Sequence, residues 1–91
     1  MAKGPKRQNG AEEQRRLCLT FPPAQIKEPL IWRLGQKFSV VTNVRQATIT
    51  DVIGIVTLEL DGKRSDINAA IKWLEKQGVS VQPVEINVIE S

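Results

Sequence analysis

Residues 29–62 read PLIWRLGQKFSVVTNVRQATITDVIGIVTLELDG, and this stretch decides the fold. Its pattern predicts a helix, a long strand, a tight turn and a second strand, in that order. Halfway along the first strand lie Asn43, Val44 and Arg45. An amide beside a cation is uncommon in a strand otherwise rich in β-branched residues. These positions are therefore the first candidates for a functional role.

The helix of this stretch is predicted from Ile26, Leu30 and Leu34, which repeat every four residues. Because Pro29 lacks an N–H, it suits the first turn, so the regular helix is expected to begin at residues 27–28. Trp32 lies opposite this apolar stripe and is predicted to contact another protein, since an exposed tryptophan supplies a large anchor area.

The strands of this stretch are predicted at residues 38–49 and 52–60, joined by a turn at residues 50–51. The dipeptide Asp61-Gly62 indicates a second turn. Before the stretch, residues 17–21 read LCLTF and alternate as a short strand does.

After the stretch, Ser65 is the expected N-cap of a second helix, which ends at Gly78. Trp73 of this helix is expected to lie along the groove between the two helices. A last strand runs from Val79 to about Ile89. Its alternation changes parity at Gln82-Pro83, which predicts an edge strand with a bulge.

The order of these elements, β-α-β-β-α-β, is that of an α+β, ferredoxin-like split βαβ fold. Right-handed crossovers place the four antiparallel strands in the order 4-1-3-2, with both helices on one face. Asn43 then lies on one edge strand and Pro83 on the opposite edge, where a missing N–H is tolerated.

Composition bounds the function. The 91 residues allow one domain, and they carry one cysteine, Cys18, and no histidine. A disulfide, a Cys/His metal site, an iron–sulfur cluster and a nucleophile–base pair are therefore not expected, nor is any cofactor or catalysis. The polar N-terminus and the short apolar runs argue against a signal peptide and a membrane span, which favours the cytoplasm.

The net charge of +3 is concentrated in residues 1–16, which hold five basic and two acidic side chains. Residues 1–15 are expected to form a flexible basic tail, and residues 16–91 the domain. Such a tail could bind nucleic acid nonspecifically. The two central strands carry Phe21 as their only aromatic residue, however, which argues against base stacking on the sheet.

The face of the sheet away from the helices is expected to be apolar, because Ile53 and Ile55 join Val41 or Cys18 there. A lone domain would leave this face wet. Val41, Ile53, Ile55 and Trp32 are therefore the predicted interface residues of a homodimer. Coverage by the last strand or by the tail is the alternative.

Residues 16–85 resemble the NIL domain, the small regulatory module at the C-terminus of the ATPase subunit of methionine-importing ABC transporters. The module also occurs beside iron–sulfur ferredoxin modules in some bacteria. Where the family usually has Asn-Ile-Leu, this chain has Asn43-Val44-Arg45. The resemblance rests on Leu17-x-Leu19-x-Phe21, Glu28-Pro29-Leu30-Ile31, residues 38–43, residues 54–60, Ala70-Ile71-Lys72-Trp73-Leu74 and Gly78-Val79-Ser80-Val81.

The resemblance implies a non-enzymatic, ACT-like domain that dimerises and binds an amino acid such as methionine, with Asn43, Val44 and Arg45 as ligand-binding residues. The Asn43 amide could pair with ligand or satisfy an edge hydrogen bond. The Arg45 guanidinium could hold a carboxylate or extend into solvent. A protein–protein adaptor that uses the open face or an edge strand is the alternative function.

Overall fold

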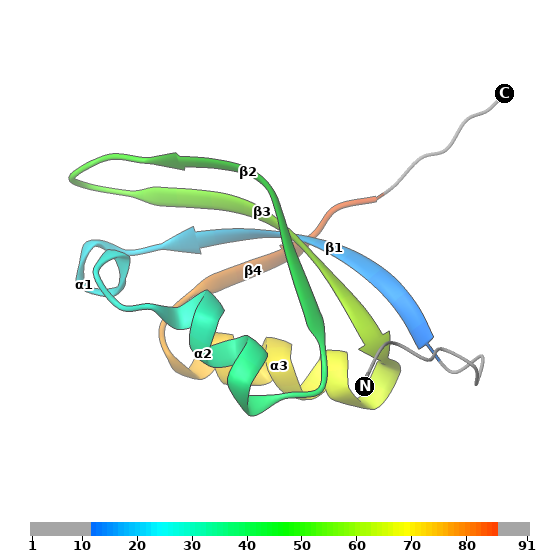
Figure 1. The fold of residues 1–91 in the computed structure, drawn as a ribbon. Coiled ribbons are helices and arrows are strands. Elements are labelled where there is room, and N and C mark those ends of the chain that lie inside the picture. The colour runs from blue at the N-terminus through cyan, green and yellow to red at the C-terminus, as the bar shows by residue number, and fades with distance from the viewer. Residues whose placement is uncertain (1–11, 86–91) are drawn as a thin grey trace, which may run out of the picture.

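The computed structural model describes residues 12–85, in which four strands form one sheet and the helices pack against one of its faces (Figure 1). The element order matches the predicted one, with a short helix added before the first long helix. The elements are β1 (Glu12–Phe21), α1 (Pro23–Ile26), α2 (Leu30–Lys37), β2 (Val41–Ile49), β3 (Gly54–Lys63), α3 (Arg64–Lys76) and β4 (Ser80–Pro83).

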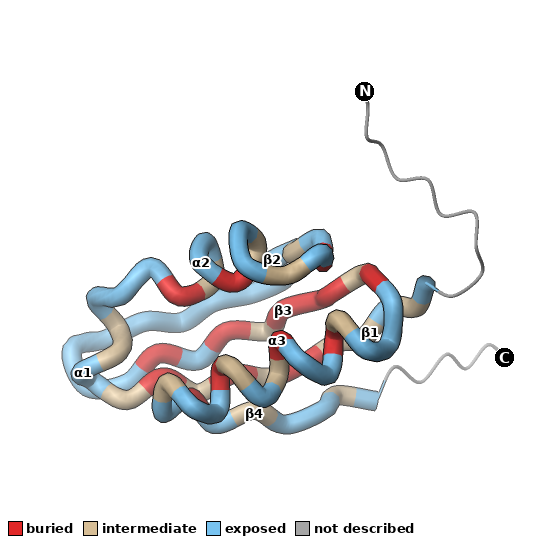
Figure 2. The backbone as a smooth tube through the Cα atoms, turned by 90° about the horizontal axis from the view of Figure 1, so that it is seen from below, coloured by how far each residue is buried: buried red, intermediate tan, exposed pale blue. Residues whose placement is uncertain are grey.

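The strands lie in the order β2-β3-β1-β4, and each neighbouring pair is antiparallel. This confirms the ferredoxin-like fold and the predicted order, with Asn43 on one edge strand and Pro83 on the other. Both α2 and α3 cover the same face (Figures 1 and 2), which we call the helix-covered face. The other face is the open face.

The core lies between the helix-covered face and the two long helices, where the buried residues gather (Figure 2). Alternate residues of β1 and β3 point toward it, and each long helix adds one apolar stripe. Full burial of such a side chain stabilises the fold by about 1.5–3 kcal/mol. The largest fully buried side chains are Leu17, Leu19, Leu30, Leu34, Leu58, Leu60, Ile67 and Leu74.

β3 extends to Lys63 because Asp61-Gly62 continues the strand, where a turn was predicted. A Cβ at position 62 would lie 2.9 Å from the Ser39 carbonyl oxygen and 3.2 Å from a methyl group of Val40. Glycine is therefore used here for close approach of two backbone segments, and not for a turn.

β1 is lengthened together with β3. It begins at Glu12, which pairs with Lys63, instead of at the predicted Leu17. Residues 12–15 of the predicted tail therefore belong to the sheet, because the longer β3 offers them a partner. The rest of that tail, residues 1–11, lies outside the described residues.

α2 begins at Leu30, and Pro29 is its N-cap rather than part of its first turn. The helix continues to Lys37, so Phe38, which was expected to open the next strand, instead ends the helix. The Phe38 ring meets Trp73 of α3 edge-on, with the ring centroids 6.1 Å apart. This contact places Trp73 at the groove between the helices, as expected.

α3 follows β3 without a loop. Lys63 is its N-cap, so the predicted cap, Ser65, lies inside the first turn. The helix ends before Gly78 as predicted, and the φ of that glycine is +92°.

The bulge lies in β2, and the prediction of a bulge at Gln82-Pro83 is wrong. β4 pairs with β1 without interruption over its whole length. In β2 the register shifts between Val44 and Gln46, which pair with consecutive residues of β3, so Arg45 is an extra residue. The predicted strand residues 86–89 lie outside the described part of the chain.

Candidate functional site

The open face is mostly polar, so the expectation of an apolar open face holds only at Val41, Cys18 and Ile55. Ile55 does lie there, but Ile53 belongs to the turn before β3 rather than to the strand. The other positions of the face that pair across β1, β2 and β3 are mostly polar. The polar ones include Gln14, Arg16, Thr20, Asn43, Gln46, Thr48, Thr57, Glu59 and Asp61, and the others are Val41 and Cys18.

The four predicted interface residues are all exposed and come from α2, β2, the turn after β2, and β3. Val41 opens β2 and shares the open face with Ile55, whereas Ile53 lies in the hairpin turn. Trp32 lies on the side of α2 opposite the buried Leu30 and Leu34, and 65% of it is exposed.

Among the described residues, the large exposed apolar side chains belong to the β2–β3 hairpin and to α2. In the hairpin they come from β2, the turn and the start of β3. They are Trp32, Val41, Val44, Ile49, Val52, Ile53 and Ile55.

The predicted ligand residues are divided between two faces. Asn43 pairs with Glu59 on the open face, whereas Val44 pairs with the buried Leu58 on the helix-covered face. Arg45 occupies the bulge between them and the rest of the strand, and its guanidinium reaches toward Glu59 on the open face. Asn43 and Arg45 are thus brought together, and Val44 is not.

A buried carboxylate, which the sequence did not single out, stands at the centre of the open face. Glu59 is only 5% exposed. The Arg16 guanidinium donates two hydrogen bonds to one carboxylate oxygen, from Nε at 2.9 Å and from Nη2 at 2.5 Å. Arg45 Nη1 lies 3.9 Å from the other oxygen and remains half-exposed. The ion pair with Arg16 compensates the buried negative charge of Glu59, which would otherwise be costly to desolvate.

A pocket of about 200 Å³ lies between the turn end of the β2–β3 hairpin and the α1–α2 segment. We call it the hairpin pocket. Its lining is mostly apolar and includes two polar side chains, Gln25 and Glu28. The remaining lining residues are Phe21, Ile26, Pro29, Leu30, Ile31, Trp32, Ile49, Gly54 and Val56.

The hairpin pocket also has groups that suit a charged ligand. The Glu28 carboxylate accepts a hydrogen bond from Arg33 at 3.0 Å, and both side chains are nearly half-exposed. The N–H groups of Ile31 and Trp32 lack intrahelical acceptors because they lie in the first turn of α2, and Pro29 supplies no side-chain cap to them. An ammonium and a carboxylate could each find a partner near this pocket.

The sequence did not identify the hairpin pocket because a strand without a bulge was assumed through residues 38–49. That pattern puts Ile49 on the same face as Ser39 and Asn43, whereas the bulge places it opposite Gly54 on the helix-covered face. The one available signal was the pair of polar residues, Asn43 and Arg45, at which the alternation breaks.

The one cysteine and the other metal-ligating residue types of residues 12–85 form no metal site. Cys18 is a free, half-buried thiol on the open face opposite Thr57. Within these residues no cluster of three or more histidine, cysteine or carboxylate side chains could hold a metal ion. No helix in this part of the chain is long and apolar enough to cross a membrane.

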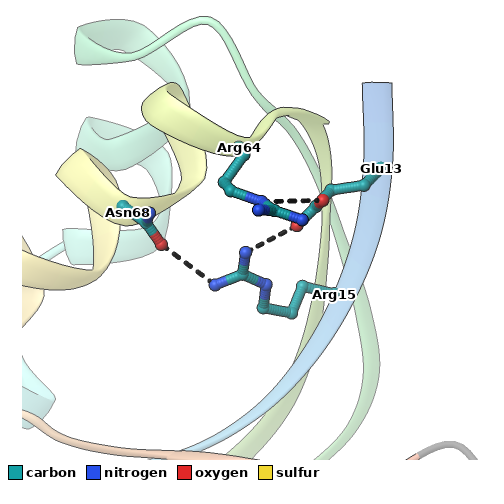
Figure 3. A network of polar contacts seen from close by, with 4 residues as sticks. All are labelled: Glu13, Arg15, Arg64 and Asn68. Atoms are coloured by element: carbon teal, nitrogen blue, oxygen red, sulfur yellow. Dashed lines mark hydrogen bonds and ion pairs between the residues drawn. The ribbon is translucent and has the colours of Figure 1, made fainter. Parts of the chain in front are cut away.

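A second polar network, absent from the sequence predictions, fixes the start of β1 to α3 (Figure 3). Arg15 Nη2 donates to Glu13 at 2.5 Å, and Arg15 Nη1 donates to Asn68 Oδ1 at 3.0 Å. Arg64 Nε lies 3.4 Å from the other Glu13 oxygen. The hydrogen bond from Arg15, with a smaller contribution from Arg64, lowers the pKa of Glu13 below its ordinary value of 4.5.

Comparison with known proteins identifies relatives of this fold. The family model of the NIL domain matches residues 15–83. The chain is 31% identical over 70 residues to the methionine import ATP-binding protein MetN of Geobacillus kaustophilus (strain HTA426). That match covers 72% of this chain and 20% of the relative, so the chain spans about a fifth of the length of the curated relative.

A solved structure agrees with this result. The C-terminal domain of an ABC transporter ATP-binding protein from Enterococcus faecalis superposes with a TM-score of 0.70 at 26% sequence identity. The superposition covers 80% of this chain and 86% of that domain.

Proposed function

The chain belongs to the NIL domain family, and from this premise we propose that it is a regulatory, non-enzymatic domain that senses a small molecule in the hairpin pocket. By similarity to the MetN relative, the ligand is an amino acid such as methionine. The observation that carries the proposal is a concave, largely apolar pocket lined by two of the large exposed apolar side chains of residues 12–85, Trp32 and Ile49.

The size of the pocket supports a small ligand. Pockets for drug-sized molecules measure about 300–1,000 Å³, whereas this one measures about 200 Å³. An amino acid fits such a volume. Phe21, Ile49 and Val56 would surround an apolar side chain, and Glu28 would meet the ammonium group.

We assign dimerisation to the free edge of β2. Within residues 12–85 this is the outer edge of the sheet, and it carries the exposed Val41, Val44 and Ile49. Such an edge is a ready template for another strand. The open face is too polar to serve as the main interface. Asn43, Val44 and Arg45 lie on the edge and do not line the pocket, so we assign them to the interface first and to the ligand second.

A cytoplasmic location is part of the proposal. The chain has one cysteine, which is free, and it resembles a domain of an ATP-binding subunit. The second candidate function, a protein–protein adaptor, is favoured by the same free edge, which could accept an extended segment of a different protein.

Thermal unfolding in the presence of each proteinogenic amino acid tests the proposal. A ligand that binds only the folded state raises the Tm. At a ligand concentration of one hundred times the Kd, the free energy of unfolding increases by about 2.7 kcal/mol. We expect methionine or a similar amino acid at millimolar concentration to raise the Tm of the wild type. Ile49→Arg fills the pocket with a charged side chain and should abolish the shift.

Ile55→Arg is the matched control, because it alters an exposed isoleucine on the open face. This variant should keep the full response. If no amino acid shifts the Tm, or if both variants respond as the wild type does, sensing in the hairpin pocket is refuted and the adaptor is favoured.

A further inference from the structure

The bulge at Arg45 determines which side chains of the outer half of β2 line the hairpin pocket. Beyond the bulge, Ile49 pairs with Gly54 on the helix-covered face, and Thr48 pairs with Ile55 on the open face. Because side chains alternate, pairing the same residues without the bulge would reverse these positions.

We call the register without the bulge the straight register, and its residue pairs follow from those observed before the bulge. Arg45 would lie opposite Thr57, Ala47 opposite Ile55 and Thr48 opposite Gly54. Thr48 would then replace Ile49 beside the hairpin pocket, and Ile49 would pass into the turn. The pocket would lose part of its apolar lining and gain a hydroxyl group.

The energies of the two registers are expected to be close. All four residues of the outer half, 46–49, are exposed, and no strand of residues 12–85 lies on the other side of β2, so burial does not fix which side faces inward. The straight register gains a strand partner for Arg45, which would pair with Thr57. The bulged register keeps the Thr50 turn, in which the N–H of Val52 and that of Ile53 each donate to Thr50 Oγ1 at 3.2 Å.

The contact that holds Arg45 in the bulge is weak. Its guanidinium lies 3.9 Å from the Glu59 carboxylate and is half-exposed, and such ion pairs contribute about 0–1 kcal/mol. Glu59 does not depend on it, since Arg16 already donates two hydrogen bonds to that carboxylate. The bulge is therefore not fixed by a strong interaction.

We propose that the Arg45 bulge is the hinge of a register switch: residues 46–49 pair with β3 in either the bulged or the straight register, and an occupied hairpin pocket selects the bulged one. This rests on the proposed function, because the ligand acts through Ile49. The switch changes which backbone groups of β2 point outward, and so it transmits occupancy of the pocket to the free edge of the sheet.

Cross-strand disulfides detect the two registers separately. In a Cys18→Ser background, Thr48→Cys with Ile55→Cys reports the bulged register, and Ala47→Cys with Ile55→Cys reports the straight one. The rate of disulfide formation in a glutathione buffer is measured by mass spectrometry. A straight register populated to about 0.1–10% makes the second pair form at that fraction of the rate of the first.

Deletion of Arg45 provides the locked control. Without the extra residue, straight pairing already puts Ile49 opposite Gly54, so the 47–55 disulfide should fall well below its rate in the full chain. Arg45→Ala keeps the extra residue and removes the guanidinium, so this variant should still form the 47–55 disulfide. The two variants separate chain length from charge.

Methionine should slow the 47–55 disulfide and leave the 48–55 disulfide at least as fast. The switch is overturned if the 47–55 pair forms no faster in the full chain than in the deletion variant. It is also overturned if methionine raises the Tm without changing either rate. Absence of any Tm shift would instead refute the proposed sensing, and the comparison with the deletion variant would still report on the registers.

Discussion

At the scale of single residues, Glu59 is the most unusual position. A carboxylate on the uncovered face of a sheet normally faces water, yet this one is 5% exposed. Two hydrogen bonds from Arg16 satisfy one of its oxygens, and the Arg45 guanidinium lies 3.9 Å from the other. The pair ties β1 to β3 at the point where β2 bulges.

Removal of Arg16 should therefore destabilise the domain. Arg16→Ala leaves a buried carboxylate without its hydrogen-bond donors, and such a loss amounts to about 1–3 kcal/mol or somewhat more for a charged group. Arg45→Ala removes only the long, half-exposed contact and should change stability by less than about 0.5 kcal/mol. Urea unfolding of both variants measures the difference, and equal effects would contradict the assigned roles.

Glu13 makes the stability depend on pH. Its pKa in the folded state lies below 4.5, mainly because Arg15 donates a hydrogen bond to it. A lowered folded-state pKa stabilises the fold above the unfolded-state value and loses that contribution as the pH falls through the folded-state value. The wild type should therefore exceed Glu13→Gln in stability at neutral pH, and the difference should vanish in acid.

Urea unfolding of the two proteins across this range measures the effect. A difference that stayed constant or grew below pH 4.5 would contradict the role of the Glu13 carboxylate.

At the scale of elements, the sequence predicted what depends on periodicity. The strand order, the two long helices and the end of α3 at Gly78 follow from apolar spacing and from glycine and proline positions. The features that depend on tertiary partners were not predictable. Gly62 looked like a turn because the close approach of Ser39 cannot be read from the sequence.

The candidate site was predicted only in part for the same reason. Asn43 and Arg45 marked the right strand, because polar residues interrupt its alternation. The bulge they accompany reverses the parity of every later residue, so the assignment of Ile49 depended on a feature that alternation alone does not show.

Two glycines have opposite backbone roles, one after the end of α3 and one inside α2. At Gly78 the φ of +92° disfavours any side chain, and the N–H of Val79 donates to the Leu74 carbonyl to close the helix. Gly78→Ala should destabilise the domain by about 1–2 kcal/mol. Gly35 lies within α2, where a Cβ would lie 4.0 Å from its nearest neighbour, Thr42.

Gly35→Ala should therefore stabilise the domain, by about 0.4–1 kcal/mol, because alanine favours the helix and restricts the unfolded chain. Thermal unfolding of the two variants should move the Tm in opposite directions. Changes of the same sign would contradict this assignment of the two backbone environments.

At the scale of the whole molecule, the apolar side chains are buried on one side of the sheet and partly exposed at the β2–β3 hairpin. The helices cover one face of the sheet (Figures 1 and 2). The open face is mostly polar, and the large exposed apolar side chains belong to the β2–β3 hairpin and to α2. A small domain gains from burying such a surface. The free edge of β2 and the hairpin pocket lie in the same region, so ligand and partner would act on the same strand.

The proposed dimer predicts that the molecular mass in solution depends on protein concentration. The wild type should associate as its concentration rises, and Val44→Lys should shift it toward the monomer, because lysine on a free edge opposes strand pairing. Light scattering over a range of concentrations measures this. A monomer mass at every concentration would contradict the assignment of β2 as the interface.

The central claim is that a small apolar amino acid occupies the hairpin pocket, and Trp32 reports on it directly because it lines that pocket. The chain has two tryptophans, so Trp73→Phe leaves Trp32 as the only fluorophore of its kind. The measurement is its emission during a titration with methionine, with Ile49→Arg in the same background as the control. The account predicts a saturable change in emission that the Ile49→Arg variant lacks, and an emission spectrum that no amino acid alters would contradict it.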